Sequence, residues 1–109
     1  MRSVQALLQE DFGLQWDMPR DRLCPTVPQK LNYICWLEDL IALRPAAAGA
    51  AAAAPASVSA IDIGTGASCI YALLGAARGW SVVATEVDEK SMASATANVE
   101  RNSLQVRSM

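Results

Sequence analysis

The sequence predicts an α/β fold, namely an incomplete Rossmann-like sheet preceded by an N-terminal helical segment. From residue 58 onward the pattern alternates strand, glycine turn, helix, strand and helix. Alternation at this spacing is typical of parallel strands joined by right-handed crossovers. Before it, residues 1–44 carry apolar side chains at helical spacing, and an alanine- and proline-rich stretch, 45–57, separates the two regions. We therefore expect a helical segment, a low-complexity linker without a catalytic role, and the first half of a Rossmann-like domain.

Composition limits the class of protein. The chain has 109 residues, of which 52% are hydrophobic, and a formal net charge of -2. No run approaches the roughly 20 apolar residues that span a bilayer, so we expect a soluble intracellular protein without a membrane partner. The nine basic residues are outnumbered by eleven acids and are dispersed, so charge alone predicts no nucleic-acid surface.

The reactive residue types exclude several chemistries. Cys24, Cys35 and Cys69 are scattered and form no CxxC pair, which predicts neither a disulfide framework nor a metal site. The chain contains no histidine. This absence excludes histidine-activated nucleophiles and most zinc hydrolase designs.

The N-terminal region predicts two helices around an extended stretch. Val4–Leu8 favours a short amphipathic helix, followed by a loop whose Phe12, Leu14 and Trp16 can be buried. Two prolines lie within Arg22–Lys30, and they predict extended backbone and no helix before Lys30.

A second helix is expected after Lys30. Its apolar stripe consists of Leu31, Ile34, Leu37, Leu40 and Ile41. Glu38 and Asp39 would then lie toward solvent. We expect Tyr33 and Trp36 to be packed in the core rather than to stack on a ligand, because large aromatic side chains are usually buried.

The C-terminal region predicts three strands and two helices, with Gly79 ending the first helix and Asp88 capping the second. The expected bounds are 57–63 for the first strand, 67–78 for the first helix, 80–85 for the second strand, 89–101 for the second helix, and 104–106 for the start of the third strand.

The turn in the segment DIGTGAS is the candidate binding site. Gly64 and Gly66 stand where the first strand becomes a helix, so backbone can approach a ligand beside amide N–H groups that are not engaged in that helix. Twenty residues after Gly66, Glu86 ends the second strand. A carboxylate there can accept hydrogen bonds from both hydroxyls of a ribose, so the combination predicts a nucleoside-bearing cofactor.

Two residues favour a cationic or zwitterionic ligand over a dinucleotide. Cys69 occupies the position at which a dinucleotide fingerprint has its third glycine. Asp62 places a second carboxylate near the turn, which is unfavourable beside two phosphates. An NAD-dependent oxidoreductase is therefore the less favoured alternative.

The D-x-G-x-G pattern with a later strand-end acid resembles the first two motifs of class I methyltransferases, which use S-adenosylmethionine. Four segments in order, ALLQEDFGL, RLCPTVPQKLNYICWLEDLI, IDIGTGASCIYALLGA and GWSVVATEVD, resemble the methyltransferase-like 16 family. That family comprises RNA adenine-N6 methyltransferases, with a bacterial ribosomal-RNA branch and a eukaryotic branch acting on U6 small nuclear RNA and a messenger RNA. The resemblance covers nearly the whole chain except the alanine-rich stretch, and it implies an intracellular enzyme of the nucleus or cytoplasm with an RNA partner.

The resemblance also implies four residues that bind S-adenosylmethionine: Lys30, Gly64, Ser68 and Glu86. Lys30 stands where the family has an arginine, and an ammonium cannot make the bidentate contact of a guanidinium. Ser68 can offer its hydroxyl or its amide to the polar end of the ligand.

The family's NPPF motif, which holds the target adenine, does not occur in this sequence. We therefore assign no catalytic residue and expect the chain to be an N-terminal fragment that is inactive alone. The alternative is a non-catalytic truncated isoform that acts as a binding module or has no function. In a class I sheet the first strand is flanked on both sides, so we also expect Ile61 and Ile63 to present an unpaired apolar edge and to reduce solubility.

Overall fold

The computed structural model describes residues 3–43, 58–102, 104 and 106–108. The elements are α1 (Val4–Phe12), α2 (Val27–Ala42), β1 (Ser59–Ile63), α3 (Ile70–Ala77), β2 (Ser81–Thr85), α4 (Glu89–Glu100) and β3 (Val106–Ser108). The three strands of the described part form a parallel sheet in the order β1-β2-β3, which confirms the predicted α/β fold class. The predicted linker, 45–57, lies outside the described residues.

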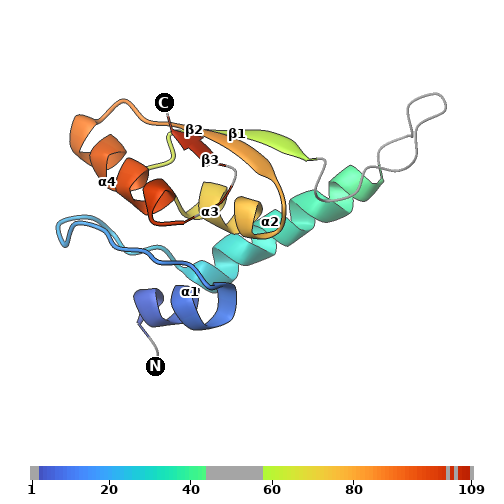
Figure 1. The fold of residues 1–109 in the computed structure, drawn as a ribbon. Coiled ribbons are helices and arrows are strands. Elements are labelled where there is room, and N and C mark those ends of the chain that lie inside the picture. Colours follow the sequence, from blue (N-terminus) through green and yellow to red (C-terminus); the bar gives the residue numbers. More distant parts are fainter. Residues whose placement is uncertain (1–2, 44–57, 103, 105, 109) are drawn as a thin grey trace.

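Helices α3 and α4 cover one face of this sheet. Both crossovers move in the same direction across the sheet, and right-handed crossovers then place α3 and α4 on one side, as Figure 1 shows. On that face Val82 and Ala84 are buried. On the opposite face Ile61 and Ile63, in the edge strand β1, are 69% and 84% exposed. Strand β1 is thus an edge strand of the described sheet, but its exposed isoleucines lie on the open face rather than along the edge. The expected effect on solubility stays a prediction.

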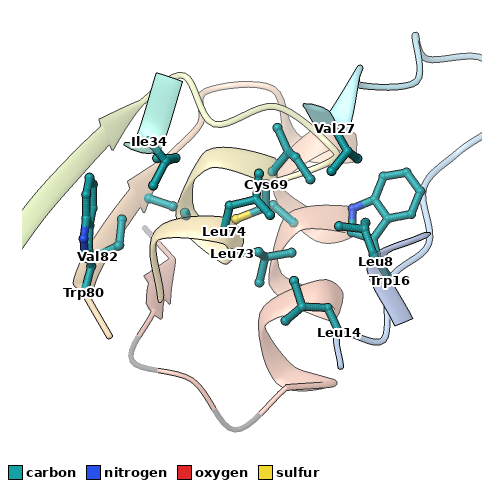
Figure 2. Close-up of a cluster of buried hydrophobic side chains, with 14 of the residues drawn as sticks. Leu8, Leu14, Trp16, Val27, Ile34, Cys69, Leu73, Leu74, Trp80 and Val82 are labelled. Atoms are coloured by element: carbon teal, nitrogen blue, oxygen red, sulfur yellow. The ribbon is translucent and has the colours of Figure 1, made fainter. Parts of the chain in front are cut away.

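The hydrophobic core is built around α3. Leu73 and Leu74 are completely buried there, and Figure 2 shows them between Leu8 and Trp16 on one side and Trp80 on the other. The N-terminal segment therefore packs directly on the Rossmann-like half. The predicted burial is confirmed for Leu14 and Trp16, which are 2% and 7% exposed. Phe12, expected in the loop, is the last residue of α1 and is partly buried.

Helix α2 starts earlier than the sequence predicted. It begins at Val27, with Thr26 as its N-cap and a proline in its first turn. The expectation of extended backbone up to Lys30 was wrong. A proline is tolerated in the first turn, because the N–H group that it lacks has no partner within the helix.

The outward face of α2 also differs from the prediction. Tyr33 and Trp36 are 46% and 53% exposed, so the expectation that they are packed in the core was wrong. The Glu38 side chain is only 13% exposed. It accepts hydrogen bonds from the Arg78 guanidinium at 2.7 Å and from Trp80 Nε1 at 3.2 Å. The reason is that this acid faces the end of α3, where the two donors bind it.

The ends of the other elements differ from the prediction by a few residues. Helix α3 begins at Ile70 because Cys69 is left-handed, with φ of 53°, and residues 66–68 form a turn. Strand β3 begins at Val106. The cap of α4 is as expected, since the Asp88 side chain accepts from the amide of Ser91 at 2.9 Å.

Replacing Gly75 by alanine is expected to destabilise the fold. In a helix interior this change is normally favourable, but a Cβ at Gly75 would lie 2.9 Å from Trp80 Cε3. The Trp80 ring is buried and hydrogen-bonded to Glu38, so moving it away would cost free energy. Urea denaturation should show a loss of about 1–3 kcal/mol. In a Trp80→Leu background the same substitution should cost little, and an equal cost in both backgrounds would contradict this explanation.

Candidate functional site

The candidate site is the turn between β1 and α3. Gly64 and Gly66 have φ of 75° and 71°, a region that side-chain-bearing residues adopt with strain. A Cβ built at either glycine would meet no heavy atom within 4 Å. The two glycines therefore leave open backbone surface at the carboxyl end of β1, as predicted. At this edge of a parallel sheet, ligands bind in α/β proteins.

The amide N–H groups of the turn are largely used within the protein. Those of Gly64 and Thr65 donate to the carbonyl oxygen of Thr85 at 2.9 and 2.8 Å. That of Gly66 donates to Glu86 Oε1 at 3.0 Å. The end of β2 thus holds the turn in its shape, and these amides offer a ligand less than the sequence suggested.

Glu86 accepts three hydrogen bonds from backbone. Besides Gly66, the amides of Val87 and Asp88 donate to its Oε2 at 3.1 and 3.0 Å. These bonds, led by that from Asp88, hold the pKa of Glu86 below its usual value. A carboxylate offers about four acceptor positions, so contact with both hydroxyls of a ribose would require one amide bond to be shared or released.

The second carboxylate, Asp62, is bound to the same turn. Its Oδ2 accepts from the hydroxyl of Thr65 at 2.7 Å. Asp62 also lines a groove of about 310 Å³ between α2, α3 and the sheet, together with Tyr33 and Tyr71. Glu86 does not line this groove. The structure therefore links the two acids through one turn, Asp62 by way of Thr65 and Glu86 by way of Gly66.

Ser68 lies at the end of the turn, against the N-terminal segment. Its carbonyl oxygen accepts from Trp16 Nε1 at 2.8 Å. The carbonyl of the preceding residue, Ala67, accepts from the hydroxyl of Ser94 at 3.0 Å. The adjacent Cys69 is buried, and burial raises the pKa of its thiol to about 11, so this cysteine is protonated and unsuited to nucleophilic chemistry.

Asn98 connects the turn with the segment before α2. This fully buried side chain accepts from the amide of Asp17 at 2.9 Å and donates to the carbonyl of Asp17 at 2.7 Å. It also donates to the carbonyl of Ala67 at 3.4 Å and accepts from Arg101. Among the described residues no buried side-chain polar atom lacks a partner.

Lys30, the fourth predicted binding residue, lies in the first part of α2 and not at the glycine turn itself. Its Nζ stands 5.2 Å from the ring centroid of Tyr71, the second residue of α3. Through this ring the structure brings Lys30 next to the segment that follows the turn. Gly64 is bonded to Thr85, the residue before Glu86, and Glu86 is bonded to Gly66. Ser68 contributes its carbonyl oxygen to the contact with Trp16.

Sequence reasoning missed two contributors to the site. Asn98 supports the turn from α4, 81 residues away from its partner Asp17. Tyr71 presents its ring to Lys30 from α3. For Tyr71 the only available signal was its place just after the glycine turn. An asparagine within a helix gives no signal of its tertiary partners.

The lowered pKa of Glu86 predicts a pH dependence of stability. The group has a lower pKa in the folded than in the unfolded chain, so its contribution is present above about pH 4.5 and is lost as the pH falls through the folded value. The difference in unfolding free energy between the wild type and Glu86→Gln should therefore shrink below pH 4.5. Urea titrations at several pH values measure this. A difference that does not change with pH would contradict it.

A parallel sheet, a two-glycine turn at its carboxyl edge and an acid at the end of the next strand define a Rossmann-like domain of the class I methyltransferase kind. The family model described as RNA methyltransferase matches residues 2–108. The chain belongs to this RNA methyltransferase family.

Known proteins resemble this chain closely in sequence and structure. It is 52% identical over 99 residues to the RNA N(6)-adenosine-methyltransferase METTL16 of Homo sapiens, a match that covers 90% of this chain and 16% of that protein. It is 45% identical over 102 residues to the U6 small nuclear RNA (adenine-(43)-N(6))-methyltransferase of Caenorhabditis elegans, covering 93% and 20%. The N-terminal domain of human METTL16 in complex with SAH superposes with a TM-score of 0.82 at 48% identity, covering 96% of this chain and 39% of that one. The chain thus spans about a sixth to a fifth of the length of these curated relatives.

Two features are absent from the residues that the structure describes. No helix there is long and apolar enough to cross a membrane. In the same part of the chain, no group of three or more histidine, cysteine or acidic side chains could hold a metal ion.

Proposed function

We propose that this chain supplies part of the methyl-donor site of an RNA N6-adenosine methyltransferase. The observation that carries the proposal is the hydrogen bond between the amide of Gly66 and Glu86, which joins the glycine turn to the acid at the end of β2. This arrangement suits a nucleoside ligand, and it occurs in a chain that belongs to an RNA methyltransferase family.

The residues present fit S-adenosylmethionine better than a dinucleotide. The space beside Gly64 and Gly66 is open, so the ligand can lie against backbone that a Cβ would cover. The Gly66 amide, which could bind a pyrophosphate, is already bound to Glu86, and Asp62 adds a second acid bonded to the turn. A dinucleotide would place its negative phosphates beside these acids, whereas an adenosyl sulfonium carries a positive charge.

Each predicted residue has a distinct part in this proposal. Glu86 accepts a ribose hydroxyl through the acceptor capacity that its three amide bonds leave. Gly64 permits close approach of the ligand, and Ser68 lies where the turn passes into α3. Lys30 provides a positive charge for the carboxylate of the ligand's amino-acid part. When bound, S-adenosylmethionine supplies an activated methyl group on a positively charged sulfur.

The RNA partner and the transfer to adenine N6 rest on family membership. The human relative is named as an RNA N6-adenosine methyltransferase and the nematode relative as a U6 small nuclear RNA methyltransferase. Their names support an RNA target of this kind and an intracellular location in the nucleus or cytoplasm. We assign no catalytic residue among the described ones, because the motif that holds the target adenine in this family does not occur in the sequence.

Isothermal titration calorimetry of the purified chain with S-adenosylhomocysteine tests the donor site. We expect saturable binding, and we expect NADH to neither bind nor compete. Circular dichroism and thermal melting of the same sample establish that the chain is folded. A folded sample that shows no heat with millimolar S-adenosylhomocysteine would overturn the proposal. Stabilisation by NADH alone in the melting assay would favour the oxidoreductase alternative.

A further inference from the structure

The ammonium group of Lys30 lies at one end of a small aromatic cluster. Its Nζ lies 5.2 Å from the centroid of the Tyr71 ring. Tyr71 in turn contacts Tyr33 edge to face, at 5.4 Å and 65°. Tyr33 is tilted against Trp36 at 5.8 Å. The three rings come from α2 and α3, so the cluster connects the helix that carries Lys30 with the helix that follows the glycine turn.

The position of Lys30 is electrostatically unfavourable without this cluster. It is the fourth residue of α2, near the positive end of the helix dipole, and the first turn of α2 contains no acid. Among the described residues none forms an ion pair with Lys30. The negative face of the Tyr71 ring is therefore the group that stabilises the ammonium in this structure.

The cluster also borders the groove beside the candidate site. Tyr33 and Tyr71 line the groove of about 310 Å³ together with Asp62, whose carboxylate is bonded to Thr65 of the turn. An ammonium held above Tyr71 thus lies close to a groove that carries an acid and two aromatic rings. A ligand with both a carboxylate and an amino group matches this combination of charges.

We propose that Tyr71 is a positioning residue, whose ring holds the Lys30 ammonium in place to receive the carboxylate of the donor's amino-acid part. This inference rests on the proposed function. A lysine side chain on its own has many rotamers, and ordering it on binding costs conformational entropy. A ring that orders it beforehand lowers that cost.

Binding measurements with two ligands test this inference. Tyr71→Leu should weaken the binding of S-adenosylhomocysteine by roughly twofold to fivefold, as expected for loss of a solvent-accessible cation–π contact. It should leave unchanged the affinity for 5′-methylthioadenosine, which lacks the amino-acid carboxylate. Tyr71→Phe keeps the ring and should bind S-adenosylhomocysteine as tightly as the wild type does. An equal loss for both ligands would indicate a structural role and overturn the inference.

Nuclear magnetic resonance of the ligand-free chain provides a second readout. The ε-methylene protons of Lys30 should be shifted upfield by the Tyr71 ring, and Tyr71→Leu should remove this shift. Trp36→Leu is the matched control, because Trp36 belongs to the same cluster but contacts Tyr33. It should preserve the Lys30 shift. No upfield shift in the wild type would overturn the inference.

The two proposals fail in different ways. A folded wild type that does not bind S-adenosylhomocysteine would overturn the proposed function and, with it, the assigned purpose of Tyr71. If the wild type binds S-adenosylhomocysteine and Tyr71→Leu binds it equally well, only the inference about Tyr71 is overturned.

Discussion

Replacing Glu86 by glutamine is expected to weaken the binding of S-adenosylhomocysteine by about 10- to 100-fold, the range that follows from losing hydrogen bonds to a charged group. The substitution removes the negative charge and turns one acceptor into an amide donor, which then faces backbone N–H groups. The amide of Gly66 or those of Val87 and Asp88 must lose their partner. Isothermal titration calorimetry measures the change in affinity.

Glu89→Gln provides the matched control for this substitution. Glu89 lies in the first turn of α4, three residues after Glu86, and its side chain is exposed. The change in net charge is the same, so any long-range electrostatic effect appears in both variants. We expect Glu89→Gln to bind like the wild type. Equal affinities of the two variants would show that Glu86 does not contact the ligand.

Replacing Asn98 by leucine is expected to destabilise the fold by about 3 kcal/mol, because leucine has a similar size but satisfies none of the polar partners. The amide and the carbonyl of Asp17 would both lose their hydrogen bonds, in a place where the Asn98 side chain is completely buried. The carbonyl of Ala67, in the turn, would lose one as well. Urea denaturation measures the loss.

Asn102→Leu is the control for the effect of burial. Asn102 also forms a reciprocal pair with backbone, accepting from the amide of Gln15 at 2.9 Å and donating to its carbonyl at 2.8 Å. This pair is open to solvent, so water can replace the lost bonds. We expect a loss below about 1 kcal/mol. If both variants lost the same stability, burial would not be the cause of the effect at Asn98.

The elements of the Rossmann-like half could be predicted because each carries a local signal. Gly64 and Gly66 mark a turn that needs positive φ, and Asp88 caps α4 with its own side chain. Those signals depend on backbone conformations that only a few residue types adopt well. The ends of elements were less predictable. Helix α3 begins later than predicted because Cys69 adopts a left-handed backbone conformation, which cysteine does not favour.

The orientation of α2 could not be read from its pattern. Helix α2 carries apolar residues on several sides, so its pattern does not decide which side faces the core. Either the core or the solvent was compatible with Tyr33, Trp36 and Glu38. The tertiary structure selects the face, because the Glu38 carboxylate meets Arg78 and Trp80 and leaves the two rings exposed. A hydrophobic scale assigns large rings to the core and cannot anticipate a largely covered acid that has two donors.

The sequence by itself determined the fold class, the glycine turn and the acid that ends β2, since all three depend on residues near one another along the chain. Only the tertiary structure decided what those groups bind. It commits the Glu86 carboxylate to three amides, ties the turn to Trp16 and Asn98, and sets the Lys30 ammonium above the ring of Tyr71. These contacts join residues far apart in the chain, and their geometry follows from packing that no local pattern encodes.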